Sequence, residues 1–232
     1  MPSAVRPAIR TTAITMPEAG QAQFRLLAWL SPTFPVGSFS YSHGLEDAAS
    51  RGLLRDARDL AAWIETLLHS GSAWNDAVLF AEAWRRVSAD EIAGEVAGLA
   101  EALVGSAERH LETTAQGHAF ATAMTAFDGT SGEAVPYCAA IAAAAARAGI
   151  ALEPALLAYL QAFVSNLLQA GIRLSILGQT GAVRTLAQLE PAIAAAASRA
   201  ARSGLDDLGS AAFMSEIAAM KHETQYSRLF RS

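Results

Sequence analysis

Apolar residues in this chain recur at the spacing of an α-helix, and no stretch alternates apolar and polar residues as a half-buried strand does. The clearest case is the row Leu60, Trp63, Ile64 and Leu67, which falls on one helical face. Asp56 stands just before this segment, where its side chain can accept hydrogen bonds from the first free backbone amides. The pattern therefore predicts an amphipathic helix that begins after Asp56, within an all-α protein.

Similar patterns, separated by short breaks of glycine, serine, aspartate or proline, predict helices along the rest of the chain. Their expected ranges are 73–87, 89–104, 106–127, 135–148, 153–177, 181–201 and 208–219. The runs AAIAAAAARAG and AIAAAASRAA are interpreted as tightly packed helices, because alanine is the best helix former and lets helices approach closely. We therefore predict a single compact helical domain of about eight to ten helices in residues 23–220. A disordered leader is expected in residues 1–22, and a partner-docking tail in residues 221–232.

Charge and hydropathy exclude two classes of partner. The net charge of -5 and the pI near 5.5 provide no basic surface for a phosphate backbone, so nucleic acid is not expected to bind. The longest apolar stretch, residues 155–172, contains Gln161, Asn166 and Gln169, which would be costly in lipid. It is predicted to be a buried core helix, with no membrane association. A single cysteine, Cys138, precludes an internal disulfide and favours a reducing compartment, the cytoplasm.

The chain lacks the residue patterns of a self-contained catalytic or metal site. Its histidines form no His-Glu-x-x-His pair, and there is no Cys-x-x-Cys. Cys138 has no neighbouring His or Lys, so we expect an inert buried thiol. The segment GSFSYSHG is not a Gly-x-Ser-x-Gly elbow, and no Gly-x-x-x-x-Gly-Lys phosphate loop is present. We therefore predict a protein that is not an enzyme and that has no catalytic residues, metal site or cofactor of its own.

The segment SPTFPVGSFSYSHGLE, residues 31–46, interrupts the helical pattern with two prolines, two glycines and four serines. Its prolines predict an extended break and Gly37 predicts a turn. Ser38 or Ser40 is then expected to cap a new helix that holds Glu46 in its early turns. Two interpretations remain open: a packed corner between helices, and a rigid recognition loop.

The C-terminal segment KHETQYSRLFRS raises the same question. Tyr226, Leu229 and Phe230 fall at i, i+3 and i+4, and Arg228 and Arg231 lie among them. Aromatic and arginine side chains dominate the hot spots of protein interfaces. We therefore favour docking of this tail to a partner chain over packing on its own domain.

Both segments resemble signatures of the urease accessory protein F family, UreF. NDAVLFAEAW and QAGIRLSILGQTGA also resemble family segments, so the likeness covers about residues 24–232. The resemblance implies an all-α, homodimer-forming accessory protein of nickel insertion. It would assemble with the accessory protein UreD, also called UreH, and the GTPase UreG on the urease apoprotein. Nickel and GTP would then be handled by the wider complex.

The resemblance is carried over residue by residue. Candidates for the interface with the GTPase or another partner are Pro35, Gly37, Ser40, Glu46, Asp76, Arg173 and Gln179. Candidates for docking UreD are His222, Glu223, Gln225, Tyr226, Arg228, Leu229, Phe230 and Arg231. No role is carried over to the helix around SAERHLETTAQGHAFATA, because its likeness to the family is loose.

Two alternatives to a scaffold remain open at this stage. The first is direct stimulation of GTP hydrolysis, with Arg173 acting as an arginine finger on the transferring phosphoryl group. The second is a nickel carrier that uses His43, His69 or His222 as ligands.

Overall fold

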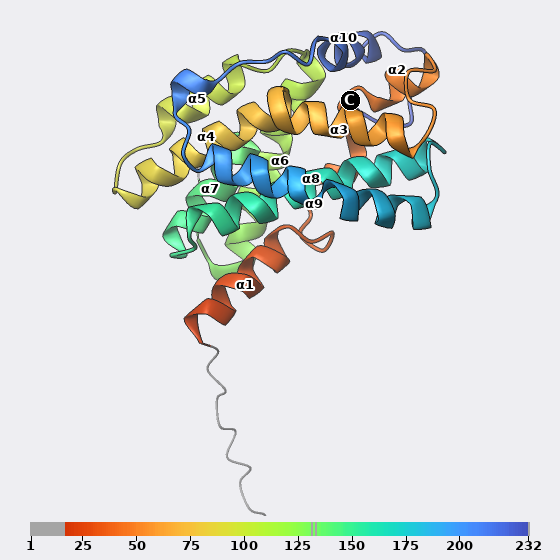
Figure 1. The fold of residues 1–232 in the computed structure, drawn as a ribbon. Helices are drawn as coiled ribbons and strands as arrows, with labels where there is room; N and C mark the ends of the chain where they lie inside the picture. Colours follow the sequence, from red (N-terminus) through yellow and green to blue (C-terminus); the bar gives the residue numbers. More distant parts are fainter. Residues whose placement is uncertain (1–16, 131, 133, 232) are drawn as a thin grey trace, which may run out of the picture.

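The structure is a computed structural model that describes residues 17–130, 132 and 134–231. These residues form a bundle of ten α-helices and two short 3-10 helices, and they contain no strand (Figure 1). The α-helices are α1 Glu18–Trp29, α2 Leu45–Ser50, α3 Ala57–Ser70, α4 Ser72–Ser88, α5 Gly94–Ala102, α6 Ala107–Asp128, α7 Tyr137–Arg147, α8 Leu152–Arg173, α9 Gln179–Ala200 and α10 Phe213–His222. The 3-10 helices are η1 Ser38–Ser40 and η2 Leu205–Asp207. The predicted all-α fold is confirmed.

Helix α4 lies at the centre of the bundle and packs against α3, α5, α7, α8 and α9. Its buried face combines small residues such as Ala77 and Ala81 with Phe80, and none of these three is exposed. Helix α7 packs closely on it through the alanine run that begins at Ala139. Small side chains let two helix backbones approach, so these alanines are part of the core. The interpretation of the alanine runs as packed helices is confirmed.

The start of α3 follows the sequence prediction closely. The Asp56 side chain accepts hydrogen bonds from the backbone N–H groups of Arg58 and Asp59, both at 2.9 Å. Leu60, Ile64 and Leu67 of the apolar stripe are buried, and Trp63 is partly buried. Capping satisfies amides that the first turn leaves without partners, and the stripe then fixes the face that points inward.

Helix α8 is long and apolar enough to cross a membrane by length and composition, but half of its most apolar window is buried inside the protein. Leu156, Leu160 and Val164 on this helix are completely buried. It packs against α3, α4, α7 and α9. The prediction of a buried core helix in residues 155–172 is therefore confirmed.

Several helix boundaries differ from the predicted ones, each for a local reason. Helix α5 begins at Gly94 instead of residue 89, because Asp90 adopts a positive φ of 59° that ends the preceding helix. Helix α8 ends at Arg173 instead of residue 177, because Ser175 has a positive φ and the Ile176 amide donates a hydrogen bond to the Gly171 carbonyl.

The two ends of the predicted domain also differ from expectation. Most of the predicted leader, residues 1–16, lies outside the described residues, whereas residues 18–22 belong to α1. Helix α10 begins later than residue 208, because the Ala211 amide bonds to the Ser70 carbonyl and holds the preceding chain along the end of α3. It then continues to His222, so the first two residues of the predicted tail are helical.

Candidate functional site

The chain between α1 and α2 turns twice through glycines. Gly37 has a φ of +74° and precedes the 3-10 helix Ser38–Ser40, and Gly44 has a φ of +77° and precedes α2. No side chain caps the start of α2. The expectation that Ser38 or Ser40 caps this helix is therefore wrong, because the chain makes a second turn before α2 begins.

Glu46, in the first turn of α2, binds the C-terminal tail. Its Oε1 accepts the backbone N–H of Leu229 at 2.7 Å, and its Oε2 accepts the backbone N–H of Phe230 at 2.9 Å. The Gln225 side chain donates to Oε1 at 3.4 Å. Hydrogen bonds from backbone amides to an ionised carboxylate are among the stronger ones in proteins. One buried carboxylate thus holds two consecutive tail amides.

Glu108, near the start of α6, is the second carboxylate on the tail. The Arg228 guanidinium donates to its Oε1 at 2.6 Å, and His222 Nδ1 lies 2.7 Å from its Oε2. The other ring nitrogen of His222, Nε2, lies 3.1 Å from Glu46 Oε2. We call these four residues, Glu46, Glu108, His222 and Arg228, the tail clamp.

Further contacts fix the last residues of the tail against the loop before α2. The Arg231 amide donates to the Ser40 carbonyl at 2.7 Å. Arg173, at the end of α8, donates to the Phe39 carbonyl at 2.6 Å and places its guanidinium 4.1 Å from the centre of the Phe230 ring. Phe230 is buried as a result. The tail is therefore packed on its own chain along one side, whereas the sequence favoured docking to a partner chain over such packing.

The structure brings most of the predicted site residues to this one place. Those that meet at or beside the tail clamp are Ser40, Glu46, Arg173, His222, Glu223, Gln225, Arg228, Leu229, Phe230 and Arg231. The Tyr226 side chain, in contrast, is fully exposed. Pro35 and Gly37 instead line a large cavity together with Asp76, and Gln179 is exposed at the start of α9.

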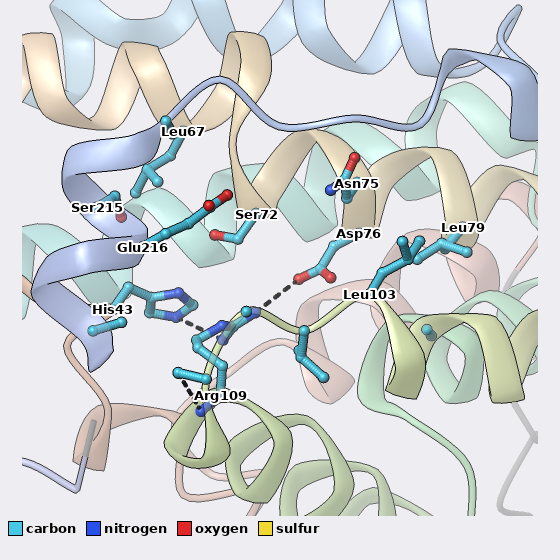
Figure 2. Close-up of a pocket in the computed structure, with 16 residues that line it drawn as sticks. His43, Leu67, Ser72, Asn75, Asp76, Leu79, Leu103, Arg109, Ser215 and Glu216 are labelled. Carbon is cyan, nitrogen blue, oxygen red and sulfur yellow. Dashed lines mark hydrogen bonds and ion pairs between the residues drawn. The ribbon is translucent and has the colours of Figure 1, made fainter. Parts of the chain in front are cut away.

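A second polar cluster lies inside the protein. The Arg109 guanidinium of α6 donates to Glu112 on the same helix and, at 3.3 Å, to Asp76 of α4. His43 Nε2 lies 3.0 Å from Glu112 Oε1. Figure 2 shows the side chain of Arg109 between His43 and Asp76. We call Asp76, His43, Arg109 and Glu112 the buried network.

Burial and charge act against each other in the buried network. Burial alone would raise the pKa of Glu112, but Arg109 and His43 outweigh it and bring the pKa down to about 2. At Asp76 burial wins and raises the pKa, although Arg109 and His43 oppose the change. Glu112 is therefore the carboxylate that is firmly ionised, and Arg109 is the charge that makes this possible.

Two cavities meet at the buried network. One, of about 50 Å³, is lined by Ser72, Ser215 and Glu216 on the side facing α10. The other, of about 720 Å³, is also lined by residues of the loop before α2. His43, Asp76 and Arg109 line both cavities, so both cavities border the polar side chains of the network.

The arrangement offers little to nucleophilic or metal chemistry. Burial raises the pKa of the Cys138 thiol well above its usual value, which disfavours the reactive thiolate. Among the described residues, no group of three or more His, Cys, Asp or Glu side chains has a geometry that would hold a metal ion. Three histidines were named as nickel ligands. His222 faces carboxylates with both ring nitrogens, His43 belongs to the buried network, and His69 is exposed.

Sequence reasoning missed the contribution of α6. This helix carries Glu108, Arg109 and Glu112, and it was the helix to which no role was carried over. Its buried residues include a polar row that the sequence spaces at four: Glu108, Glu112 and Gln116. The sequence did contain one indication of this. In this long helical segment polar residues recur at the helical spacing, where a buried face would normally show apolar residues.

Comparisons with known proteins all match the same protein family. The family model described as UreF matches residues 54–190, more than half of the chain. A protein named urease accessory protein UreF from Mesorhizobium japonicum is 57% identical over 215 residues, which cover 91% of this chain and 96% of the relative. Urease accessory protein UreF 1 from Brucella canis is 54% identical, with 91% and 94% covered. The protein of the same name from Brucella anthropi is 50% identical over 222 residues, with 94% and 97% covered.

Proposed function

The chain belongs to the UreF family of urease accessory proteins, and from that premise we propose that it is a non-catalytic scaffold for urease maturation. In this proposal it joins the accessory protein UreD, also called UreH, and the GTPase UreG on the urease apoprotein. Nickel and GTP are handled by the wider complex. The tail clamp is the site through which the chain presents its C-terminus to UreD.

The observation that carries the proposal is the division of the tail into two sides. The inner side is fixed by the tail clamp and by burial of Phe230. The outer side leaves the Tyr226 side chain fully exposed and the Leu229 side chain 53% exposed. A tail that is ordered before binding loses less conformational entropy when a partner docks, so its exposed aromatic and apolar side chains are well placed as anchors.

The outer face of α10 extends this surface. Four large apolar side chains on this ten-residue helix are at least 39% exposed. They are Phe213, Met214, Ile217 and Met220. Exposed apolar residues that gather on one element mark protein interaction sites. The face of α10 and the tail that follows it therefore form one candidate surface for UreD.

We further propose a homodimer that works in the cytoplasm. Helix α1 projects from the body of the bundle (Figure 1), and its Phe24 and Leu27 side chains are 54% and 66% exposed. An apolar helix in that position is suited to packing against a second copy of the chain. The reducing compartment is supported by the single buried cysteine, Cys138.

The docking role is tested by removing the outer side chains while the tail clamp stays intact. We expect Tyr226→Ala together with Leu229→Ala to weaken capture of UreD at least about 10-fold, because these side chains would be interface anchors. Binding of purified UreD by calorimetry measures the effect. Truncation after Met220 is the more drastic form and should abolish capture.

The matched control is Ile92→Ala together with Val183→Ala. These side chains are 85% and 69% exposed on other parts of the bundle, on α9 in the case of Val183. We expect capture of UreD to stay at the wild-type level in this variant. Unchanged affinity in both the tail variant and the truncated chain would contradict the docking role.

The alternative function, direct stimulation of GTP hydrolysis through Arg173, makes a different prediction. The exposed guanidinium of Arg173 already contacts the Phe39 carbonyl and the Phe230 ring, which supports a role in holding the tail. We therefore expect Arg173→Ala to leave GTP turnover per assembled complex within about 3-fold of the wild type. A loss of about 1,000-fold with assembly intact would instead identify an arginine finger. Single-turnover hydrolysis by UreG in the purified complex distinguishes the two.

A further inference from the structure

His222 has a carboxylate on each side of its ring. The side chain is completely buried at the end of α10, with Nδ1 facing Glu108 and Nε2 facing Glu46. An ionised carboxylate can only accept a hydrogen bond, so each ring nitrogen has to carry a proton for both bonds to form. The geometry with two ionised carboxylates therefore requires the imidazolium, the charged form of histidine.

The same two carboxylates hold the tail. Glu46 receives the amides of Leu229 and Phe230, and Glu108 receives Arg228. Two carboxylates at one buried site repel each other unless a positive charge lies between them. The Arg228 side chain is 43% exposed and bonds to Glu108, whereas the His222 ring lies against both acids.

The charged groups around the ring come from every element that packs there. Helix α2 supplies Glu46 and helix α6 supplies Glu108. The tail supplies Arg228 behind Glu108, and Glu223, whose carboxylate accepts the Ala107 amide at the start of α6. Loss of the ring proton would leave one nitrogen lone pair pointing at a carboxylate oxygen about 3 Å away, a repulsive contact at a fully buried side chain.

We propose that the His222 imidazolium is a pH-sensitive latch that keeps the C-terminal tail on the body of the protein. The latch is closed while the ring carries both protons and opens as rising pH removes one of them. Residues 223–231 then leave the body while the helical core stays folded, because a terminal segment with exposed side chains is the least costly part to release. If the proposed docking function holds, the affinity for UreD falls over the same pH range.

A pH titration of the wild-type chain tests the latch directly. Long-range 1H–15N correlations of the imidazole report the proton on each ring nitrogen, and the amide resonances of Leu229 and Phe230 report tail docking. As the pH rises we expect the His222 ring to lose a proton and both amides to move toward unfolded positions with the same midpoint. Amides of α4 should not follow. A ring that is neutral while the tail is docked, or a tail that stays docked after deprotonation, would overturn the latch.

Variants separate the latch from general effects of pH. We expect His222→Gln, which cannot carry the charge, to leave both amides at unfolded positions throughout the range. The matched control is His118→Gln, the same change at an exposed histidine of α6, and it should keep the wild-type titration. A docked tail in His222→Gln would also overturn the latch. If that variant fails to fold, the wild-type titration alone decides.

Binding of UreD is measured separately across the same range. Affinity that falls with the tail transition supports both the latch and the docking role. Affinity that stays constant while the tail is released leaves the latch standing and counts against the proposed docking function instead.

Discussion

Replacing Arg109 with methionine is expected to lower the free energy of unfolding by about 3–5 kcal/mol, a large part of the roughly 5–15 kcal/mol that stabilises a typical domain. Methionine keeps much of the length and apolar stem of arginine but removes the charge. Asp76 and Glu112 would then be left inside the protein without their shared cation. Urea denaturation followed by circular dichroism measures the loss.

The matched control for this change is Arg55→Met. Arg55 also pairs with a carboxylate, that of Asp59, but its side chain is 71% exposed. Solvent screens such a pair, so we expect a much smaller loss than at Arg109. Equal losses at the two positions would show that the buried network has no special weight in stability.

Acid provides a second check on the same network. The pKa of Glu112 is lowered from 4.5 to about 2, so its contribution is present above pH 4.5 and is lost as the pH falls toward 2. The raised pKa of Asp76 has the opposite effect on stability, because a carboxyl group whose pKa is raised by folding stabilises the protein at low pH and loses this contribution as the pH rises. We therefore compare the acid sensitivity of the wild type with that of Glu112→Gln, and expect the loss of stability below about pH 4.5 to be smaller in the variant.

Most helices were predictable because an apolar stripe indicates which side of a helix is buried. Asp56 and the stripe through Leu60 and Ile64 are local signals, and both have the predicted roles. The boundaries that failed depend on single backbone conformations, such as the positive φ of Asp90 and Ser175. Non-glycine residues adopt that conformation in only a small minority of positions, so the local pattern did not predict these two turns.

The buried network and the tail clamp were harder to predict, because their partners lie far apart in the sequence. Glu46 and Phe230 are separated by 184 residues, and Glu108 and His222 by 114. Local patterns identified the loop before α2 and the tail as unusual, left open whether the loop is a packed corner or a recognition loop, and favoured docking of the tail to a partner. In the structure each covers part of the other, and a docking role remains a prediction for the outer side of the tail.

Helix α6 shows most clearly what the local sequence pattern could not predict. A charged helical face normally indicates exposure to solvent, and Glu108, Arg109 and Glu112 are buried instead. Their burial is tolerable only because α4, α10, the loop before α2 and the tail supply partners of opposite charge or hydrogen-bonding capacity. Pairing of that kind is a property of the assembled fold.

The second large effect is expected from Gly44→Ala at the start of α2. Gly44 has a φ of +77°, and an added Cβ would lie 2.8 Å from the backbone nitrogen of Ala219 in α10. The left-handed conformation costs alanine roughly 1–2 kcal/mol, and the crowding adds roughly 1–3 kcal/mol. Because the obstacle is backbone, α10 has to move as a unit, and His222 moves with it. We expect the free energy of unfolding to fall by roughly 2–5 kcal/mol and the tail amides of Leu229 and Phe230 to shift toward unfolded positions.

Gly52→Ala is the control that separates crowding from backbone strain. Gly52 lies just beyond the other end of α2 and has a similar φ of +71°, but no atom lies within 4 Å of the place where its Cβ would be. Alanine there carries the conformational cost of roughly 1–2 kcal/mol without displacing a helix. The tail amides should therefore keep their wild-type positions in Gly52→Ala and lose them in Gly44→Ala. Tail release in both variants, or in neither, would show that the close approach of α10 to Gly44 does not position the tail clamp.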